Sequence, residues 1–259
     1  MTQNPISSQP AQSDVAPLVA VVVPVRNEAE NILPLVAEIA AALRGRYLFE
    51  IIYVDDGSDD QTPARLREAR TLYPELRSIR HQSGCGQSQA VASGVKVARA
   101  SVIVTLDGDG QNDPADIPIL LERLLKEPLD QQDFLLVGGY RQARQDNALR
   151  RLSSSVANRI RAGLLGDDTP DSGCGLKVFT RAAFLDMPRF NHMHRFLPAL
   201  MLRRGGRTLS IAVHHRPRQR GQSKYGLWNR LWVGIVDLLG VMWLQSRASL
   251  PVFDGETNE

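Results

Sequence analysis

Short apolar segments alternate with longer segments of helical periodicity over the first 140 residues. The apolar segments are rich in Val, Ile and Leu and lack polar alternation, which is typical of strands buried on both faces of a parallel sheet. They cover residues 18–24, 50–54, 76–80, 102–106 and 134–138. The helical segments cover residues 28–43, 62–73, 87–98 and 114–126. This order predicts βαβ units, and therefore an α/β fold whose mostly parallel central sheet carries helices on both faces.

The pattern changes after residue 141. We expect helices at 150–165 and 195–204, strands at 176–180 and 208–214, and a basic loop at 216–225. A last, apolar helix is expected at 227–244, followed from about residue 248 by a polar tail that runs to 259.

That last helix is amphipathic and rich in tryptophan. Trp228, Trp232 and Trp243 are flanked by Arg230 and Arg247, as in helices that lie in a membrane interface. The apolar run is too short to span a bilayer cleanly. A core helix that packs on the sheet is the alternative, and the sequence leaves both open.

The chain start has a different composition. Residues 1–16 are polar and rich in Pro, Ser and Gln, without the basic start and apolar centre of a signal peptide. We therefore expect a disordered leader at 1–16, a main domain at 17–225, the last helix at 226–247 and a flexible tail at 248–259.

Charge is distributed unevenly along the 259 residues. Residues 1–139 contain 12 Lys/Arg and 19 Asp/Glu, whereas residues 140–230 contain 18 and 5. An acidic half suits a cation, and a basic half suits phosphates or an anionic membrane surface. No helix-turn-helix, zinc-finger or base-stacking pattern supports a nucleic-acid partner. Cys85 and Cys174 are expected to be free thiols in a reducing cytosol, without a catalytic role.

Polar clusters follow three of the predicted strands, at 24–28, 55–59 and 107–109. Ligands of such sheets bind beyond the carboxyl ends of the strands. Asp107 and Asp109 are separated by a glycine, and two carboxylates at that spacing suit Mg²⁺ or Mn²⁺. An Asx-rich turn is the plainer interpretation. Asp113 could be proposed as a base, but before a helix that starts at Pro114 it is expected to be structural.

Histidines occur in pairs at 192 and 194 and at 214 and 215, without the spaced partners of a zinc site. We expect them in loops or on the acceptor side.

Six motifs in a fixed order resemble those of family 2 glycosyltransferases with the GT-A fold. The resemblance is greatest to the branch of dolichol-phosphate mannosyltransferases and other polyprenyl-phosphate hexosyltransferases, and it runs from about residue 19 to 244. The motifs are VVPVRNE (22–28), VDDGSDDQT (54–62), LDGDGQNDP (106–114), GYR (139–141), DSGCGLK (171–177) and RGQSKY (220–225).

By resemblance, the ends of the first two strands hold the nucleotide. The base and ribose would contact Pro24, Arg26, Glu28, Val54 and Asp56. Carboxylates are suited to this because they accept hydrogen bonds from ribose hydroxyls or a base edge. Position 26 is commonly aromatic in the mannosyltransferases, so Arg26 leaves guanine and uracil open as the base.

The resemblance assigns the divalent cation to Asp107 and Asp109, with Gln111 near the same site and Gly108 in contact with the donor. Such a cation offsets charge on the departing nucleoside diphosphate. Lys177 is placed at the donor phosphates.

The acceptor phosphate is assigned to basic and hydroxyl side chains beyond residue 140. They are Arg141, Arg151, Arg195, Arg220, Ser223 and Lys224. Arg141 and Arg220 join Asp107 and Asp109 as the expected catalytic residues, because arginine grips phosphate oxygens bidentately.

The implied activity is an inverting, dolichyl-phosphate β-D-mannosyltransferase-like transfer of a hexose to a polyprenyl or dolichyl phosphate, for cell-envelope glycan or lipid glycosylation. GDP-mannose is the favoured donor. A lipid monophosphate is already anionic at neutral pH, since its second pKa is about 6, so it needs orientation rather than a base. We expect a cytoplasmic protein, peripheral on the cytoplasmic face of the membrane, and leave a homo-oligomer open.

Three alternatives remain from the sequence. In the first, the same fold uses a UDP-sugar as donor. In the second, the acceptor is a glycan or protein hydroxyl, which would require a carboxylate base beyond residue 140. In the third, the chain is a non-catalytic module that binds a nucleotide-sugar or nucleic acid.

Overall fold

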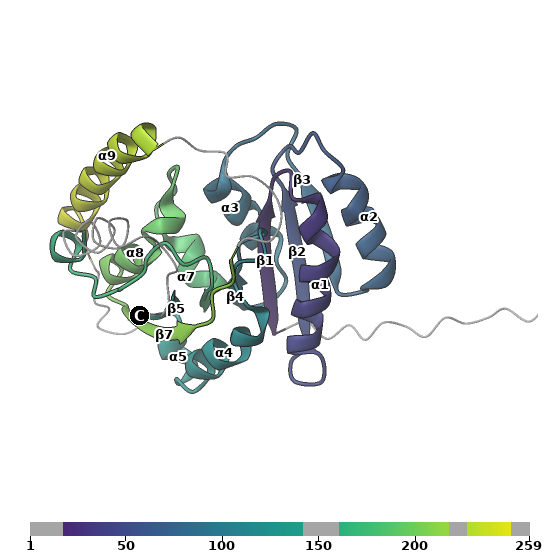
Figure 1. Ribbon diagram of the computed structural model, residues 1–259. Coiled ribbons are helices and arrows are strands. Elements are labelled where there is room, and N and C mark those ends of the chain that lie inside the picture. The colour runs from purple at the N-terminus through teal and green to yellow at the C-terminus, as the bar shows by residue number, and fades with distance from the viewer. Residues whose placement is uncertain (1–17, 142–160, 218–226, 250–259) are drawn as a thin grey trace, which may run out of the picture.

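The computed structural model describes residues 18–141, 161–217 and 227–249 (Figure 1). These residues form a seven-stranded sheet in the order β3-β2-β1-β4-β6-β5-β7. The strands are β1 (Val19–Val25), β2 (Phe49–Asp55), β3 (Leu76–Arg80), β4 (Val102–Thr105), β5 (Leu135–Arg141), β6 (Lys177–Thr180) and β7 (Arg207–Val213).

The sheet is mostly parallel, as the sequence predicts. β1 pairs in parallel with β2 and β4, β2 with β3, and β5 with β7. Only β6 runs against its neighbours β4 and β5. The ends of β2, β1 and β4 therefore lie next to one another, and the three polar clusters follow these ends.

Helices cover both faces of the sheet (Figure 1). They are α1 (Ala29–Leu43), α2 (Thr62–Leu72), α3 (Gln87–Val97), α4 (Ile117–Leu125), α5 (Leu129–Gln132), α7 (Arg181–Asp186), α8 (Leu197–Arg203) and α9 (Leu227–Ser246), with 3₁₀ turns η1 (Pro114–Asp116) and η2 (Met193–Arg195).

Strand side chains divide between two cores because successive residues point to opposite faces. Val21 and Val23 of β1 pack in the core that contains the apolar side of α1, whereas Val22 packs in the core that contains α3. α3 lies very close to the sheet: a Cβ on Gly94 would overlap the side chain of Val22 and meet Val54 at 3.1 Å. Burial on both faces explains the continuous apolar strands.

Two expected helices begin later than their apolar patterns. The segment 114–126 divides into η1 and α4, and α8 begins at Leu197, two residues after η2 ends. Pro118 and Pro198 lie in the first turns of α4 and α8. Proline is suited to a first helical turn because its missing N–H has no partner to lose there. The short α7 follows β6 directly and was not expected from its sequence.

The last helix, α9, is confirmed. Val241 is fully buried, and Leu238 and Met242 pack on the core that contains α3 and α8. The other side is exposed, with Ile235, Val236, Leu239 and Trp243 each more than 40% accessible. The helix therefore packs by one face and presents an apolar face outward.

Among the residues that the structure describes, no helix combines the length and apolar character needed to cross a membrane. The side chains of Trp228 and Trp232, the predicted leader and most of the predicted tail lie outside the described residues. Of the helix predicted at 150–165, residues 161–165 are described and are helical.

Candidate active site

The loop after β4 lies directly against the end of β1. A Cβ on Gly108 would overlap the side chain of Val25 and reach the carbonyl oxygen of Pro24 at 2.9 Å, so only glycine allows this approach. The contact sets Asp107 beside the end of β1, as the position of the motif at a strand end predicts.

A cavity of about 150 Å³ opens at this point. It is lined by four of the predicted site residues, namely Pro24, Asp107, Lys177 and Arg195. These residues come from β1, the loop after β4, β6 and η2, so segments up to 171 residues apart in the chain meet in one place. Gln87 and His194, which the sequence did not single out for this cavity, also line it.

Asp107 is half-buried in this cavity and accepts a 2.8 Å hydrogen bond from Nε2 of Gln87. Burial, followed by repulsion from Asp109, raises the pKa of Asp107 to about 6. Lys177 and Arg141 oppose this shift. Gly175 lies against the carboxyl group so closely that a Cβ there would overlap it.

Asp109 faces a second cavity of about 220 Å³, which Asn31, Glu38 and Arg216 also line. Its Oδ1 accepts a 3.1 Å hydrogen bond from the backbone N–H of Gln111. The mutual repulsion of Asp107 and Asp109 is what a divalent cation would relieve, and carboxylate oxygens suit Mg²⁺ or Mn²⁺. The residues present therefore fit the expected cation.

The two cations that oppose the pKa shift of Asp107 have protein partners. Arg141 forms a bidentate ion pair with Asp171, with Nε–Oδ2 at 2.5 Å and Nη2–Oδ1 at 2.8 Å. Nζ of the buried Lys177 donates to the carbonyl oxygen of Cys174. Burial lowers the pKa of Lys177, and the negative charge of Asp107 acts against this. Their predicted phosphate contacts stay predictions.

On the nucleotide side, Asp56 is buried at the end of β2. Its carboxylate accepts 2.8 Å hydrogen bonds from the backbone N–H groups of Cys85 and Gly86 and from Nδ1 of His81. Burial alone would raise the pKa of Asp56, but these hydrogen bonds outweigh it and hold the pKa below its usual value. Asp56 is therefore ionised and held in one orientation.

The other nucleotide candidates are spread over the same edge of the sheet. Arg26 is exposed, and its guanidinium lies against Gly84. Glu28 is half-buried and accepts a 2.7 Å hydrogen bond from Asn31 at a wide cavity of about 720 Å³. Val54 is fully buried against α3, so its side chain does not reach a ligand.

Hydrogen bonds and ion pairs join the end of β7 to the loop after β4. His214 binds Asp116 through its backbone N–H at 2.7 Å and through Nδ1 at 2.9 Å. Arg216 pairs with Asp113 and with Glu38 of α1, each at 2.7 Å. Asp113 also caps η1, a structural role as expected, by accepting from the N–H of Ala115. The chain is thus fixed beside Asp109 just before residue 218.

His194 is held at the cavity by a long-range contact. Its Nδ1 lies 2.7 Å from Oγ of Ser88, 106 residues earlier in the chain, and Oγ also accepts from the backbone N–H of His194. Burial lowers the pKa of His194 to about 3, so the ring is neutral. The neutral ring is thus held at the cavity by its hydrogen bond with Ser88.

Several predicted residues lie outside the described part of the chain. They are Arg151, Arg220, Ser223 and Lys224. Their roles at an acceptor phosphate stay predictions. Both cysteines are free, as expected, with Cys85 exposed and Cys174 buried.

The sequence is similar to that of known proteins. The family described as Glycosyl transferase family 2 matches residues 20–187. A dodecaprenyl-phosphate galacturonate synthase of Rhizobium johnstonii is 36% identical over 237 residues, which are 90% of this chain and 68% of that protein. An undecaprenyl-phosphate 4-deoxy-4-formamido-L-arabinose transferase of Edwardsiella ictaluri is 34% identical over 213 residues, 81% of this chain and 63% of that protein. The chain thus spans about two thirds of the length of these relatives.

A solved structure has the same fold. The mannosyltransferase of Pyrobaculum calidifontis, in complex with GDP-Man and Mn²⁺, superposes with a TM-score of 0.64 at 18% identity, over 92% of this chain and 67% of that one. The GT-A fold expected from the motifs is confirmed by this likeness. The match of the family over most of the chain shows that it belongs to glycosyl transferase family 2.

Proposed function

We propose that this family 2 glycosyltransferase moves a sugar from a nucleotide-sugar to a polyprenyl phosphate, by one in-line displacement that inverts the anomeric carbon. One observation carries the proposal: Asp107 lines the same cavity as Lys177 and Arg195. Such a cavity offers a carboxylate for a cation and positive side chains for phosphates. The names of the two relatives, which act on dodecaprenyl and undecaprenyl phosphate, support this acceptor class.

On the donor side, Asp56 and Glu28 supply carboxylates for the base and ribose, and Asp107 and Asp109 hold Mg²⁺ or Mn²⁺, with Gln111 nearby. When bound, the cation supplies positive charge to the diphosphate that leaves the sugar. Gln87 orients the Asp107 carboxylate through its 2.8 Å hydrogen bond. The neutral ring of His194 lines the same cavity.

The acceptor is proposed to be a phosphate because a hydroxyl would need a base. Asp167 and Asp171, two carboxylates of the second half of the chain, are both ion-paired, with Arg161 and Arg141. A lipid monophosphate carries its own charge near neutral pH, since its second pKa is about 6. Arginines that orient it suffice.

GDP-mannose, favoured by the motifs, is the first candidate donor. A nucleotide-linked uronic acid is the second, because one relative is a galacturonate synthase. Arg195 and Lys177 in the cavity favour the second candidate, since each could pair with a sugar carboxylate.

The test offers the purified chain a panel of GDP- and UDP-linked sugars with Mn²⁺ and a short polyprenyl phosphate. We expect a lipid-linked sugar from one donor, at a rate that falls as the pH drops below about 6, where the phosphate gains a proton. The unphosphorylated prenol is the matched control and should give no product. Equal transfer to the prenol would rule out a phosphate nucleophile, and no product from any donor would count against the activity.

We further propose that the protein attaches to the cytoplasmic face of the membrane through the exposed face of α9. This face consists of Ile235, Val236, Leu239 and Trp243. Apolar side chains with an interfacial tryptophan suit a helix that lies in the headgroup region. It would bring the cavity to a lipid-borne acceptor.

A further inference from the structure

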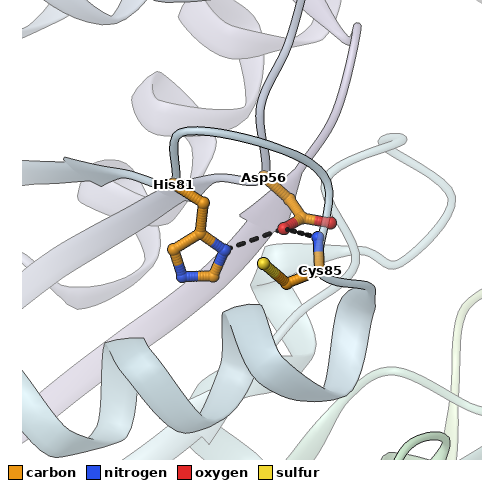
Figure 2. A group of neighbouring side chains, drawn as sticks. All are labelled: Asp56, His81 and Cys85. Carbon is orange, nitrogen blue, oxygen red and sulfur yellow. Dashed lines mark hydrogen bonds and ion pairs between the residues drawn. The ribbon is translucent and has the colours of Figure 1, made fainter.

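Three side chains of different chemistry converge next to the nucleotide side of the site. Asp56 follows β2, His81 follows β3, and Cys85 lies just before α3. One ligand atom of each lies within 4.8 Å of the other two. Figure 2 shows the imidazole, the carboxylate and the thiol turned toward one another. Among the described residues, these are the three His, Cys, Asp or Glu side chains that lie close enough together to hold a metal ion as a group of three.

Two members of the group, His81 and Asp56, also form hydrogen bonds with residues outside the group. Nε2 of His81 lies 2.9 Å from Oγ of Ser93 on α3, while its Nδ1 faces Asp56 at 2.8 Å, in a hydrogen bond that the ion would replace. The backbone N–H of Gly86 holds the second carboxylate oxygen of Asp56. Such outer hydrogen bonds orient metal ligands and set the histidine tautomer.

The third member is free to complete the set. Cys85 is exposed and lies between two glycines, and its thiol makes a 3.3 Å contact to the carbonyl oxygen of Ser83. Ligand atoms around a tetrahedral zinc lie about 3.5 Å apart, given bonds of about 2.0–2.3 Å. The exposed Cys85 side chain would have to rotate to close the remaining gap.

We propose that Asp56, His81 and Cys85 bind a zinc-type divalent ion, at a site separate from the Asp107–Asp109 cation. Sulfur, nitrogen and carboxylate oxygen together suit Zn²⁺, whereas Mg²⁺ prefers oxygen alone. Binding moves the ring proton of His81 from Nδ1 to Nε2, where it donates to Ser93, and the thiol proton leaves to solvent. The ion would bind Asp56, the carboxylate that the proposed function assigns to the nucleotide. Bound zinc would therefore exclude the nucleotide-sugar donor, a consequence that rests on the proposed function.

The site itself is tested without turnover by titrating the whole chain with Co²⁺ alone. We expect one equivalent to produce a thiolate-to-cobalt charge-transfer band, which Zn²⁺ then abolishes by displacement. Cys85→Ser should lose the band, and Ser93→Ala should bind about 10–100-fold more weakly. Asp109→Asn is the matched control and should keep the band. Absence of the band in the wild type, or its persistence in Cys85→Ser, would overturn the site.

The consequence is tested by adding Zn²⁺ to the transferase assay in excess Mn²⁺. We expect inhibition that donor overcomes competitively and that Cys85→Ser reduces at least tenfold, each variant being compared with its own zinc-free rate. Inhibition that donor does not relieve, or that Cys85→Ser leaves unchanged, would overturn the competition. An inactive chain that still forms the cobalt band would refute the proposed function and leave the metal site standing.

Discussion

At the scale of single residues, the position of Asp107 depends on a missing side chain. Gly175 lies against its carboxyl group, with no room for a Cβ, while Thr105 donates a 2.7 Å hydrogen bond to the carbonyl of the same glycine. Gln87, at the start of α3, donates a hydrogen bond to the Asp107 carboxylate. The geometry of the predicted cation site therefore depends on backbone approach as much as on the acidic motif.

Gly175→Ala should displace Asp107 and lower kcat by about 100-fold, because a shift of about 1 Å at a reacting centre costs that much. Transferase kinetics measure this, and circular dichroism checks that the fold is kept. Gly173→Ala on the same loop is the control, since its Cβ would meet its nearest neighbours at an ordinary 3.5 Å. Equal activity of the two variants would contradict the packing role of Gly175.

His194 provides a pH test. The pKa is about 3 in the folded protein and near 6.5 when unfolded, so the unfolded state takes up a proton first as the pH falls. The stabilisation is present above pH 6.5 and is lost as the pH falls toward 3. Urea unfolding should show that His194→Gln loses about 1–2 kcal/mol less than the wild type between pH 7 and pH 5. Parallel pH curves would show that the ring is not held neutral.

The site could be predicted only in part. Asp107 and Lys177 line one cavity because Asp107 follows β4 and Lys177 begins the antiparallel neighbour β6, and Arg195 joins them from η2, outside the motifs. Gln87 was not among the candidates, and His194 was expected only in a loop or on the acceptor side, since nothing local marks its contact with Ser88. The inward position of Val54 was also not predictable: only the close packing of α3 shows that this side chain faces the core.

At the scale of secondary-structure elements, the apolar segments predicted the strands closely because both faces of the sheet are buried. The antiparallel direction of β6 was not predictable, since the order and type of the preceding elements do not fix the direction in which a strand enters the sheet. The short α7 was missed because it has less than two turns and is capped by Thr180 at the end of β6.

α9 combines two properties that the sequence left as alternatives. One side packs on the domain through Val241. At the last turn, Nε of Arg203 donates to the carbonyl oxygen of Leu244, and Nε2 of Gln245 donates to that of Leu165. Asp237, which interrupts the apolar run, pairs with His192 at 2.9 Å. The outward apolar face of α9 is therefore the face that the proposed membrane attachment would use.

Leu239→Gln combined with Trp243→Gln should release the protein from anionic liposomes, because membrane binding scales with buried apolar area. Flotation of the whole chain measures this. Ile119→Gln on α4 is the matched control, since this exposed apolar residue lies on another helix. Flotation of the double variant to the same extent as the wild type would contradict attachment through α9.

At the scale of the whole molecule, the uneven charge of the sequence becomes a contact between the two halves. Arg216, from the basic half, pairs with Asp113 and Glu38 from the acidic half. The end of β7 is thereby fixed beside the loop that carries Asp109. Arg216 therefore lies at the cavity that Asp109 lines, and its positive charge suits phosphates there.

The most direct test of this account is the transferase assay on Asp109→Asn beside Asp113→Asn. Loss of the Asp109 charge should lower the formation of polyprenyl-phosphate sugar by about 10²–10³-fold, the cost of removing a preorganised charge stabiliser. Asp113→Asn, whose carboxylate caps η1 on the same loop, should stay within about tenfold of the wild type. Full activity of Asp109→Asn with its fold intact would contradict the paired-aspartate cation site on which the account depends.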